Sequence, residues 1–301
     1  MSVKPMATVL VVGMAVVDFL FEVDSMPDRA EKYVASNAQI VGGGGAANAA
    51  CAIAKLGGNA MLAARIGDDM IGNLIIDDLN TYAVDCSLVS VSKNGRSSYS
   101  SVLLDSAGER QIVNFRGRDL SDDVSLIERS KPDAVLADTR WQAGAMAAMR
   151  LAREHKISGV LDAEPPLDPD LLQLASHIAF SKQGLEALAG KLSGPQQIEM
   201  ALRDVQKEYS GWVAMTDGGD GVYSLLDDQL MHQPAARIDV VDTLGAGDVW
   251  HGAFAYWLGL HNHETSAVEF ANAAATLKCT RSGGGRASPA FEEVERFMHH
   301  S

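Results

Sequence analysis

The stretch Asp242-Thr-Leu-Gly-Ala-Gly-Asp-Val-Trp-His-Gly-Ala-Phe254 decides how the rest of this sequence is interpreted. It follows residues 237–241, a β-branched run that predicts a strand, and leads into residues 249–258, whose apolar spacing predicts a buried helix. Its first two glycines are therefore expected where a helix begins, and the free N–H groups of a first turn favour an anion. Asp248 brings a carboxylate to the same point. That combination suits a base that takes the proton of a hydroxyl attacking a phosphoryl group.

The short motif Gly-Ala-Gly-Asp alone more often marks an ordinary strand-to-helix turn with an aspartate near the N-cap. The match here is longer. Asp-Thr-x-Gly-Ala-Gly-Asp, then a small-residue apolar helix roughly fifty residues from the C-terminus, resembles the signature of the ribokinase-like (PfkB-type) carbohydrate kinases. The resemblance implies that Asp248 is the catalytic base and that the anion hole is formed by Gly245, Ala246 and Gly247.

Composition narrows the class of protein. The 301 residues, 47% hydrophobic and 21% charged, suit one α/β domain with an appendage or two small domains. The net charge of −14 argues against a nucleic-acid or membrane partner. Three widely spaced cysteines, Cys51, Cys86 and Cys279, form no metal-ligand spacing, and they favour a reducing cytoplasm over a disulfide framework. Residues 1–17 lack a cleavage pattern, so we expect a buried strand there and no signal peptide.

Strand–helix alternation predicts the architecture. Residues 7–13 form a continuous apolar run of the kind buried in a parallel sheet, and from residue 131 onward strands alternate with helices. Further expected strands are 60–66, 134–137, 159–162, 177–180 and 212–216, and expected helices are 46–56, 144–155, 169–175, 184–189 and 195–208. Two strand-rich pieces, about 19–40 and 97–118, predict hairpins of a small β-sheet lid that excludes water from phosphoryl transfer. With the resemblance, this gives a single ribokinase-like α/β domain over residues 1–301: a three-layer parallel-sheet core, helices on both faces, and the lid.

The glycine run Val41-Gly-Gly-Gly-Gly-Ala-Ala-Asn48 precedes a small-residue helix and could be a phosphate loop or a flexible turn. GxxxxGK[ST] is absent, and the first strand is not followed by GxGxxG. In ribokinase-like enzymes a Gly-Gly followed by Asn lines the sugar site. The resemblance therefore assigns sugar hydroxyls to Asp18, Gly43, Gly44 and Asn48, whose donors and acceptors suit a polyol.

The nucleotide side rests on two further stretches. Thr216-Asp-Gly-Gly-Asp-Gly221 is a tight turn between two strands, and the motif alone favours a plain hairpin turn. The family has an equivalent Thr-x-Gly-x-x-Gly that contacts the nucleotide, and its adenine-site helix matches the alanine-rich segment around residue 272. The resemblance thus implies nucleotide contacts at Thr216, Gly218, Gly221 and Asn272, with the loop 281–288 closing the pocket.

One segment departs from the family pattern. Many members carry Asn-x-x-Glu, which organises the water shell of the magnesium–phosphate complex, whereas this chain has Ser181-Lys-Gln-Gly184. Ser181 stays a candidate at the nucleotide, Lys182 could contact phosphate, and the metal ligands are unknown. The expected cofactors are ATP and Mg²⁺ and, as in many relatives, a monovalent cation such as K⁺ near Asp242 and residues 281–288.

Finer matches concern the acceptor sugar. Basic residues near the lid invite an anionic substrate, although any one of them is more often a solvent-exposed charge. The sequence around Lys32, Asn114, Arg140 and the run 277–281 resembles the 6-deoxy-6-sulfofructose kinases, a branch of this family that phosphorylates the C1 hydroxyl of a sulfosugar. By that resemblance Lys32, Asn114 and Arg140 bind the sulfonate through an ammonium, an amide and a guanidinium.

Other functions remain open. Within the class, the substrate could be neutral fructose or another ketohexose, another sugar phosphate, or a nucleoside. From a different class, a non-catalytic sugar-binding regulator would fit the missing Asn-x-x-Glu, but the intact Asp248 argues against it. The expected partners are a small-molecule sugar and ATP, with no nucleic acid and no membrane, and the family resemblance suggests a homodimer through the lid.

Overall fold

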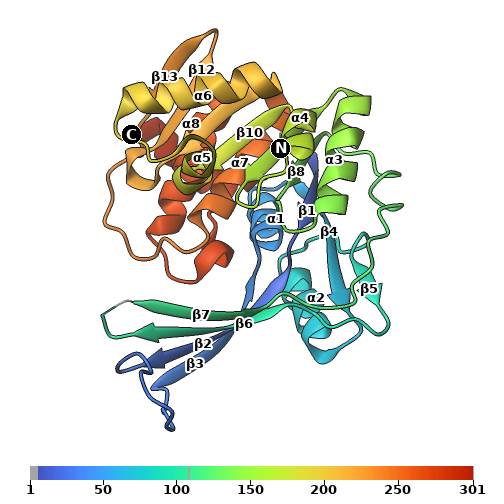
Figure 1. The fold of residues 1–301 in the computed structure, drawn as a ribbon, viewed down its shortest axis with the longest axis vertical. Helices are drawn as coiled ribbons and strands as arrows, with labels where there is room; N and C mark the ends of the chain where they lie inside the picture. The colour runs from blue at the N-terminus through green and yellow to red at the C-terminus, as the bar shows by residue number, and fades with distance from the viewer. Residues whose placement is uncertain (1–5, 108, 301) are drawn as a thin grey trace.

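The structure is a computed structural model that describes residues 6–107 and 109–300. Within this part of the chain the core is a nine-stranded sheet (Figure 1). Its order is β13 (Gln229–Gln233), β12 (Val222–Leu226), β11 (Trp212–Thr216), β10 (His177–Ser181), β9 (Ser158–Ala163), β8 (Ala134–Ala137), β1 (Thr8–Gly13), β4 (Asn59–Gly67) and β5 (Ser90–Ser92). The strands from β11 to β5 run parallel, and β12 and β13 extend one edge in antiparallel pairing.

Helices cover both faces of this sheet. One hydrophobic core contains residues of α1 (Gly45–Lys55), α2 (Met70–Thr81), α7 (Ala246–His261), α8 (Glu264–Cys279) and α9 (Phe291–His300). The other contains residues of α3 (Gln142–His155), α4 (Pro169–Leu174), α5 (Lys182–Ala189) and α6 (Pro195–Tyr209). Strand β1 serves both cores, because Val9 and Val11 face the first and Leu10 and Val12 the second. This alternation explains its unbroken apolar sequence and confirms the predicted three-layer architecture.

A separate four-stranded sheet, which we call the lid, projects from the core (Figure 1). Its order is β3 (Asn37–Gly43), β2 (Val16–Val23), β6 (Tyr99–Asp105) and β7 (Arg110–Phe115). Both expected hairpins are present, since β2 pairs antiparallel with β3 and β6 with β7. Parallel pairing of β2 with β6 joins the two hairpins into one sheet. Gly108, in the expected turn of the second hairpin, lies outside the described residues.

The strand predicted at residues 237–241 is wrong. This segment joins no sheet, and Val240 and Val241 are each 62% exposed. The N–H groups of Val241 and Asp242 both donate to the carbonyl oxygen of Cys279, at 2.8 and 3.2 Å, so the segment is held by a helix end and not by a strand. Its β-branched residues line a pocket described below. The short strand β5 and the polar β13 were not predicted, because neither has the apolar pattern of a buried strand.

Within residues 6–107 and 109–300, no helix combines the length and the apolar character needed to cross a membrane.

Candidate active site

The start of α7 has the geometry that its glycines predict. Gly245 is the N-cap, with a left-handed φ of 73°, and a Cβ atom there would lie 2.5 Å from the backbone nitrogen of Gly285. Only glycine fits such a position. Gly247 opens onto free space, whereas the N–H of Ala246 already donates to the carbonyl oxygen of Thr243 at 3.1 Å. The N–H groups of the first turn have no partner inside the helix, so this end of α7 can receive an anion.

Asp248 begins a chain of polar contacts that joins four elements, because it continues through Asn48 and Arg286 to Asp78. Its Oδ2 accepts from the Asn48 amide at 2.6 Å, and the Asn48 Oδ1 accepts from Arg286 at 3.0 Å. The guanidinium of Arg286 also donates to Asp78 through Nε at 3.0 Å and Nη2 at 2.7 Å. Burial raises the pKa of Asp248 above its ordinary value, against the lowering effect of the Asn48 bond. The contacts orient Asp248 and leave its Oδ1 available to a ligand.

Sequence reasoning missed Arg286, and it assigned Asn48 to a sugar hydroxyl, which stays a prediction. Both polar atoms of the Asn48 side chain are used within the protein, toward Asp248 and Arg286. Asn48 thus lies beside the predicted base, at the place expected to meet the sugar. The available signal for Arg286 was an arginine inside the glycine-rich loop 281–288, a loop that the sequence analysis assigned to the nucleotide pocket and to a monovalent cation.

Two further carboxylates lie near Asp248, and the sequence analysis did not identify them. Asp138 follows β8 directly and accepts from the N–H groups of Met14 and Arg140, both at 2.8 Å. Its burial raises its pKa to about 6, although those N–H groups oppose the shift. Asp162 lies in β9, and its Oδ1 is 3.1 Å from Nε2 of His251. A carboxylate at the end of a buried parallel strand is itself a sequence signal, because such strand ends gather at one edge of the sheet.

These groups share one small cavity. It is lined by Gly45, Ala46, Ala49, Leu136, Asp138, Asp162, Asp248 and His251.

The predicted sugar-binding residues of the lid lie in one row. Asp18 of β2 pairs with Ser100 of β6, which pairs with Asn114 of β7. The Asn114 amide donates to the Ser100 hydroxyl at 3.0 Å, and Ser100 also bonds to Asp18. Burial raises the pKa of Asp18, while Ser100 and the charge of Arg286 act against the increase. A Cβ on Gly43 would lie 2.4 Å from Asp18 Oδ2, so this glycine makes room for the carboxylate.

The other predicted substrate residues flank that row. Gly44 is the N-cap of α1 with a φ of 93°, which directs the chain from the lid into the helix. Arg140 is exposed beyond the end of β8, and its Nη1 donates to the carbonyl oxygen of Pro165 at 2.7 Å. Lys32 is exposed in the connection between β2 and β3. The structure joins Asp18 and Asn114 through Ser100, and it places Lys32 and Arg140 on separate segments.

A larger pocket of about 320 Å³ opens on the other side of the α7 start. It contains all four of the nucleotide residues predicted from turn and helix motifs, namely Thr216, Gly218, Gly221 and Asn272. Ala246 and Gly247 line it too, as do Ile238 and Val240 of the segment predicted as a strand. The Asn272 amide is held on both sides: its Oδ1 accepts from Trp250 Nε1 at 2.8 Å, and its Nδ2 donates to the Gln233 carbonyl at 3.1 Å.

Ser181 lies at the end of β10, where its hydroxyl caps α5 by accepting from the N–H of Gly184 at 3.0 Å. The next residue, Lys182, forms a 2.7 Å ion pair with Asp217 in the turn that follows β11. Among the residues that the structure describes, no group of three or more His, Cys, Asp or Glu side chains is arranged to hold a metal ion.

Asp242, where a monovalent cation was expected, already has an internal cation. The Lys278 ammonium, 0% exposed, lies 2.7 Å from the Asp242 carbonyl oxygen and 3.2 Å from its Oδ2. The N–H groups of Leu244 and Gly284 donate to the same carboxylate at 2.9 and 3.0 Å. Burial alone would raise the pKa of Asp242, but these N–H groups and Lys278 outweigh it and hold the pKa below its ordinary value. The loop that leads into α7 is therefore tied to α8.

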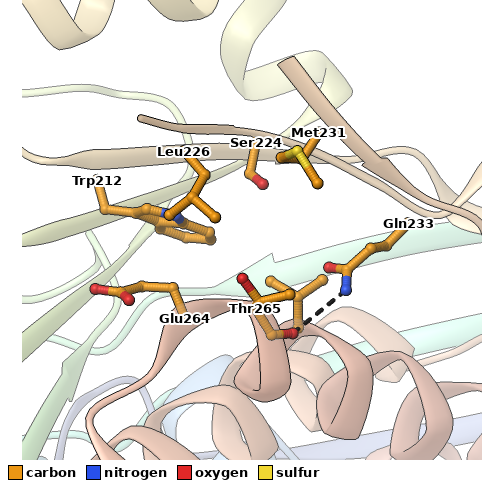
Figure 2. Close-up of a pocket in the computed structure, with 8 residues that line it drawn as sticks. Trp212, Ser224, Leu226, Met231, Gln233, Glu264 and Thr265 are labelled. Carbon is orange, nitrogen blue, oxygen red and sulfur yellow. Dashed lines mark hydrogen bonds between the residues drawn. The ribbon is translucent and has the colours of Figure 1, made fainter. Parts of the chain in front are cut away.

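Figure 2 shows a third cavity, at the opposite ends of the strands, where the bond from Gln233 Nε2 to the Thr265 carbonyl at 3.3 Å closes one side. It is lined by Trp212, Ser224, Leu226, Met231, Gln233, Glu264, Thr265 and Val268. Its volume of about 10 Å³ suits a single water molecule at most, and it contains no predicted site residue.

The arrangement places the first turn of α7 between two compartments. Ala246 and Gly247 face the larger pocket, while Asp248, the next residue, faces the carboxylate cavity. The first turn of α7 therefore adjoins both the larger pocket and the carboxylate cavity.

Comparison with known proteins agrees with this chemistry. Residues 6–290 match the sequence model of the pfkB family carbohydrate kinases. The ribokinase of Bacillus subtilis is 25% identical over 97% of this chain and 100% of its own length, and fructokinase-2 of Zea mays is 27% identical over 89% and 88%. The structure of Arabidopsis thaliana ribokinase complexed with ribose and ATP superposes with a TM-score of 0.89 at 24% identity, covering 98% of this chain and all of that one. The last similarity shows the fold.

Replacing Lys278 with methionine should expose the energetic role of the buried pair. The variant keeps the length of the side chain but removes the buried cation and leaves Asp242 only the half-exposed Arg110, 3.7 Å away. The free energy of unfolding should therefore fall by about 3 kcal/mol, measured by urea denaturation. Arg203→Met is the matched control, because Arg203 and Glu199 form an exposed pair one helical turn apart and should contribute less than about 0.5 kcal/mol. Equal losses in the two variants would contradict the assignment.

Proposed function

Since this chain belongs to the pfkB family of carbohydrate kinases and is an ATP-dependent sugar kinase, we propose that its acceptor is the C1 hydroxyl of an anionic ketose such as 6-deoxy-6-sulfofructose. The observation that supports the transfer itself is the position of Asp248, which shares the first turn of α7 with residues of the larger pocket and lines the carboxylate cavity beside it. ATP binds in that larger pocket, against Thr216, Gly218 and Gly221. The relatives include a fructokinase, which supports a ketose.

Proton transfer follows from the contacts of Asp248. The sugar hydroxyl attacks the γ-phosphorus of ATP, the bond from that phosphorus to the bridging oxygen of ADP breaks, and the hydroxyl proton passes to Asp248. Asn48 holds Oδ2 of Asp248 at 2.6 Å, so Oδ1 is directed to the proton. The N–H groups of Gly245, Ala246 and Gly247 stabilise the charge on the transferring phosphoryl group. For the N–H of Ala246 this requires release of its bond to Thr243.

The row of Asp18, Ser100 and Asn114 supports sugar binding beneath the lid. Asp18 accepts hydroxyl protons, while Gly43 and Gly44 let a polyol lie against the backbone. We assign the anionic end of the substrate to Arg140. One of its N–H groups is bound to Pro165, and because a guanidinium has five N–H donors, others can bind the anion. Lys32 and Asn114 supply the remaining positive and amide donors, once the lid closes on the sugar.

The binding of Mg²⁺ and of a monovalent cation is inferred from residues of the same region. We propose that Mg²⁺ is held mainly by the phosphates of ATP and by water, with Ser181 and Lys182 nearby, in place of the absent Asn-x-x-Glu. A monovalent cation fits poorly at Asp242, because the Lys278 ammonium already occupies its oxygens. Turnover should therefore be the same in sodium and potassium buffers, and stimulation by potassium would contradict this.

A sugar panel tests the acceptor. ADP release with ATP and Mg²⁺ should be fastest with 6-deoxy-6-sulfofructose among that sugar, fructose 6-phosphate, fructose 1-phosphate, fructose and ribose. Arg140→Ala should lower kcat/KM for the sulfosugar, with a loss of about 2 kcal/mol of transition-state stabilisation. The value of kcat/KM for fructose should be unchanged. Arg150→Ala, on the exposed side of α3, is the control and should alter neither.

An equal effect of Arg140→Ala on fructose and its sulfonate would remove the sulfonate assignment. Activity confined to neutral sugars, to another sugar phosphate or to a nucleoside would agree with the kinase activity but contradict the assignment of a sulfosugar as the acceptor. Sugar binding without ADP release would favour the alternative that the protein is a non-catalytic sugar-binding regulator.

Asp248→Asn tests the base. The amide keeps the shape and the contact with Asn48 but cannot accept the proton, so kcat should fall by at least about 100-fold. The variant should still bind the sugar, measured by the shift that the sugar causes in the thermal unfolding temperature. An unchanged kcat would show that another group takes the proton.

A further inference from the structure

His251 lies one turn after Asp248 on α7 and is 4% exposed. Its Nε2 is 3.1 Å from Asp162 Oδ1. Its Nδ1 is buried and, among the described residues, has no hydrogen-bond partner. A buried imidazole with one nitrogen on a carboxylate is arranged to carry a proton, because the carboxylate stabilises the charged ring.

The surroundings of His251 carry an excess of negative charge. A Cβ atom on Gly45 would lie 3.4 Å from Asp248 Oδ1, 3.6 Å from Asp138 Oδ2 and 3.9 Å from Asp162 Oδ2. Three carboxylates therefore converge within 4 Å of one point. Like charges so close raise one another's pKa and favour protonation, which would disable a base.

The charged groups that act most strongly on this cluster come from several elements. Asp138 directly follows β8, Asp162 lies in β9 and Glu164 lies just beyond it, and all three are acidic. Arg286 approaches from the loop after α8, but its Nε and Nη2 are committed to Asp78. The element α1 contributes only the neutral Asn48 to Asp248. Among these groups, His251 is thus the one on α7 itself that can carry a positive charge beside the acids.

We propose that His251, held by Asp162, is a positioning residue of the kinase reaction that supplies the positive charge needed to keep Asp248 ionised. The proposal rests on the role of Asp248 as base. Burial would lower the pKa of His251, but Asp162 and Asp248 together raise it above its ordinary value. For Asp248, burial and the charge of Asp162 raise the pKa, while Asn48, His251 and Arg286 lower it.

A role in packing alone makes a different prediction. His251 lies edge-on to Trp250, with ring centroids 5.1 Å apart, and loss of this contact would reduce stability or kcat/KM equally at every pH. A role in charge balance instead moves the acidic limb of the pH profile of kcat/KM, because that limb reports the protonation of the base in the free enzyme.

The experiment measures this profile for His251→Gln with whichever sugar the wild-type protein turns over. The acidic limb should move up by about one pH unit, so that activity falls about tenfold more at the acidic end than at alkaline pH. His177→Gln is the matched control: His177 is 6% exposed and 3.4 Å from Glu264, at the opposite end of the sheet. The control should leave the limb in place.

The double variant Asp162→Asn/His251→Gln distinguishes the effect of charge on the acidic limb from the effect of altered packing. It removes one charge of each sign, so the limb should return toward the wild-type position although the packing is changed further. An unmoved limb in His251→Gln, or a double variant with its limb no closer to wild type, overturns the proposal. Wild-type activity in Asp248→Asn would instead overturn the assignment of the base.

Wild-type protein gives an answer even if the variants do not fold. Ring-nitrogen NMR at neutral pH should show a buried histidine that is already protonated and whose signal persists in His177→Gln. Absence of any such histidine overturns the proposal.

Discussion

The arrangement of the site depends on one hydrogen bond, which joins Asn48 of α1 to Asp248 of α7. Asp248 is partly buried, it stands in the first turn of α7, and its pKa is raised by that burial. The amide of Asn48 donates to this carboxylate at 2.6 Å, and Arg286 in turn donates to the oxygen of that amide. The Asn48 bond and the charge of Arg286 both act against the increase in the pKa of Asp248.

That network requires two helices to approach closely, and small residues make this possible. A Cβ on Gly252 of α7 would lie 2.7 Å from the carbonyl oxygen of Ala49 on α1. The same closeness places the side chains of Asn48 and Asp248 within hydrogen-bond reach. The small residues where the two helices cross therefore serve the site as well as the core, because a larger side chain there would separate Asp248 from the Asn48 amide.

The parallel sheet supplies the rest of the site. The strands β8, β9, β10 and β11 end at one edge, and each end carries a polar residue: Asp138, Asp162, Ser181 and Thr216. Open α/β sheets bind ligands at this edge because the strand ends and the loops that follow converge there. The Lys278–Asp242 pair completes the arrangement by fixing the loop from which α7 starts.

The sequence by itself determined what depends on neighbours along the chain. The turn at Gly245, the α7 start, both lid hairpins and the strand–helix alternation all follow from local pattern. Tertiary structure decided the pairings. Arg286 meets Asn48 from 238 residues away, Asn48 meets Asp248 from 200, and His251 joins Asp162 across the core. It also left residues 237–241 unpaired despite their β-branched pattern. Such contacts depend on how helices and strand ends pack together, and no spacing in the sequence encodes that distance.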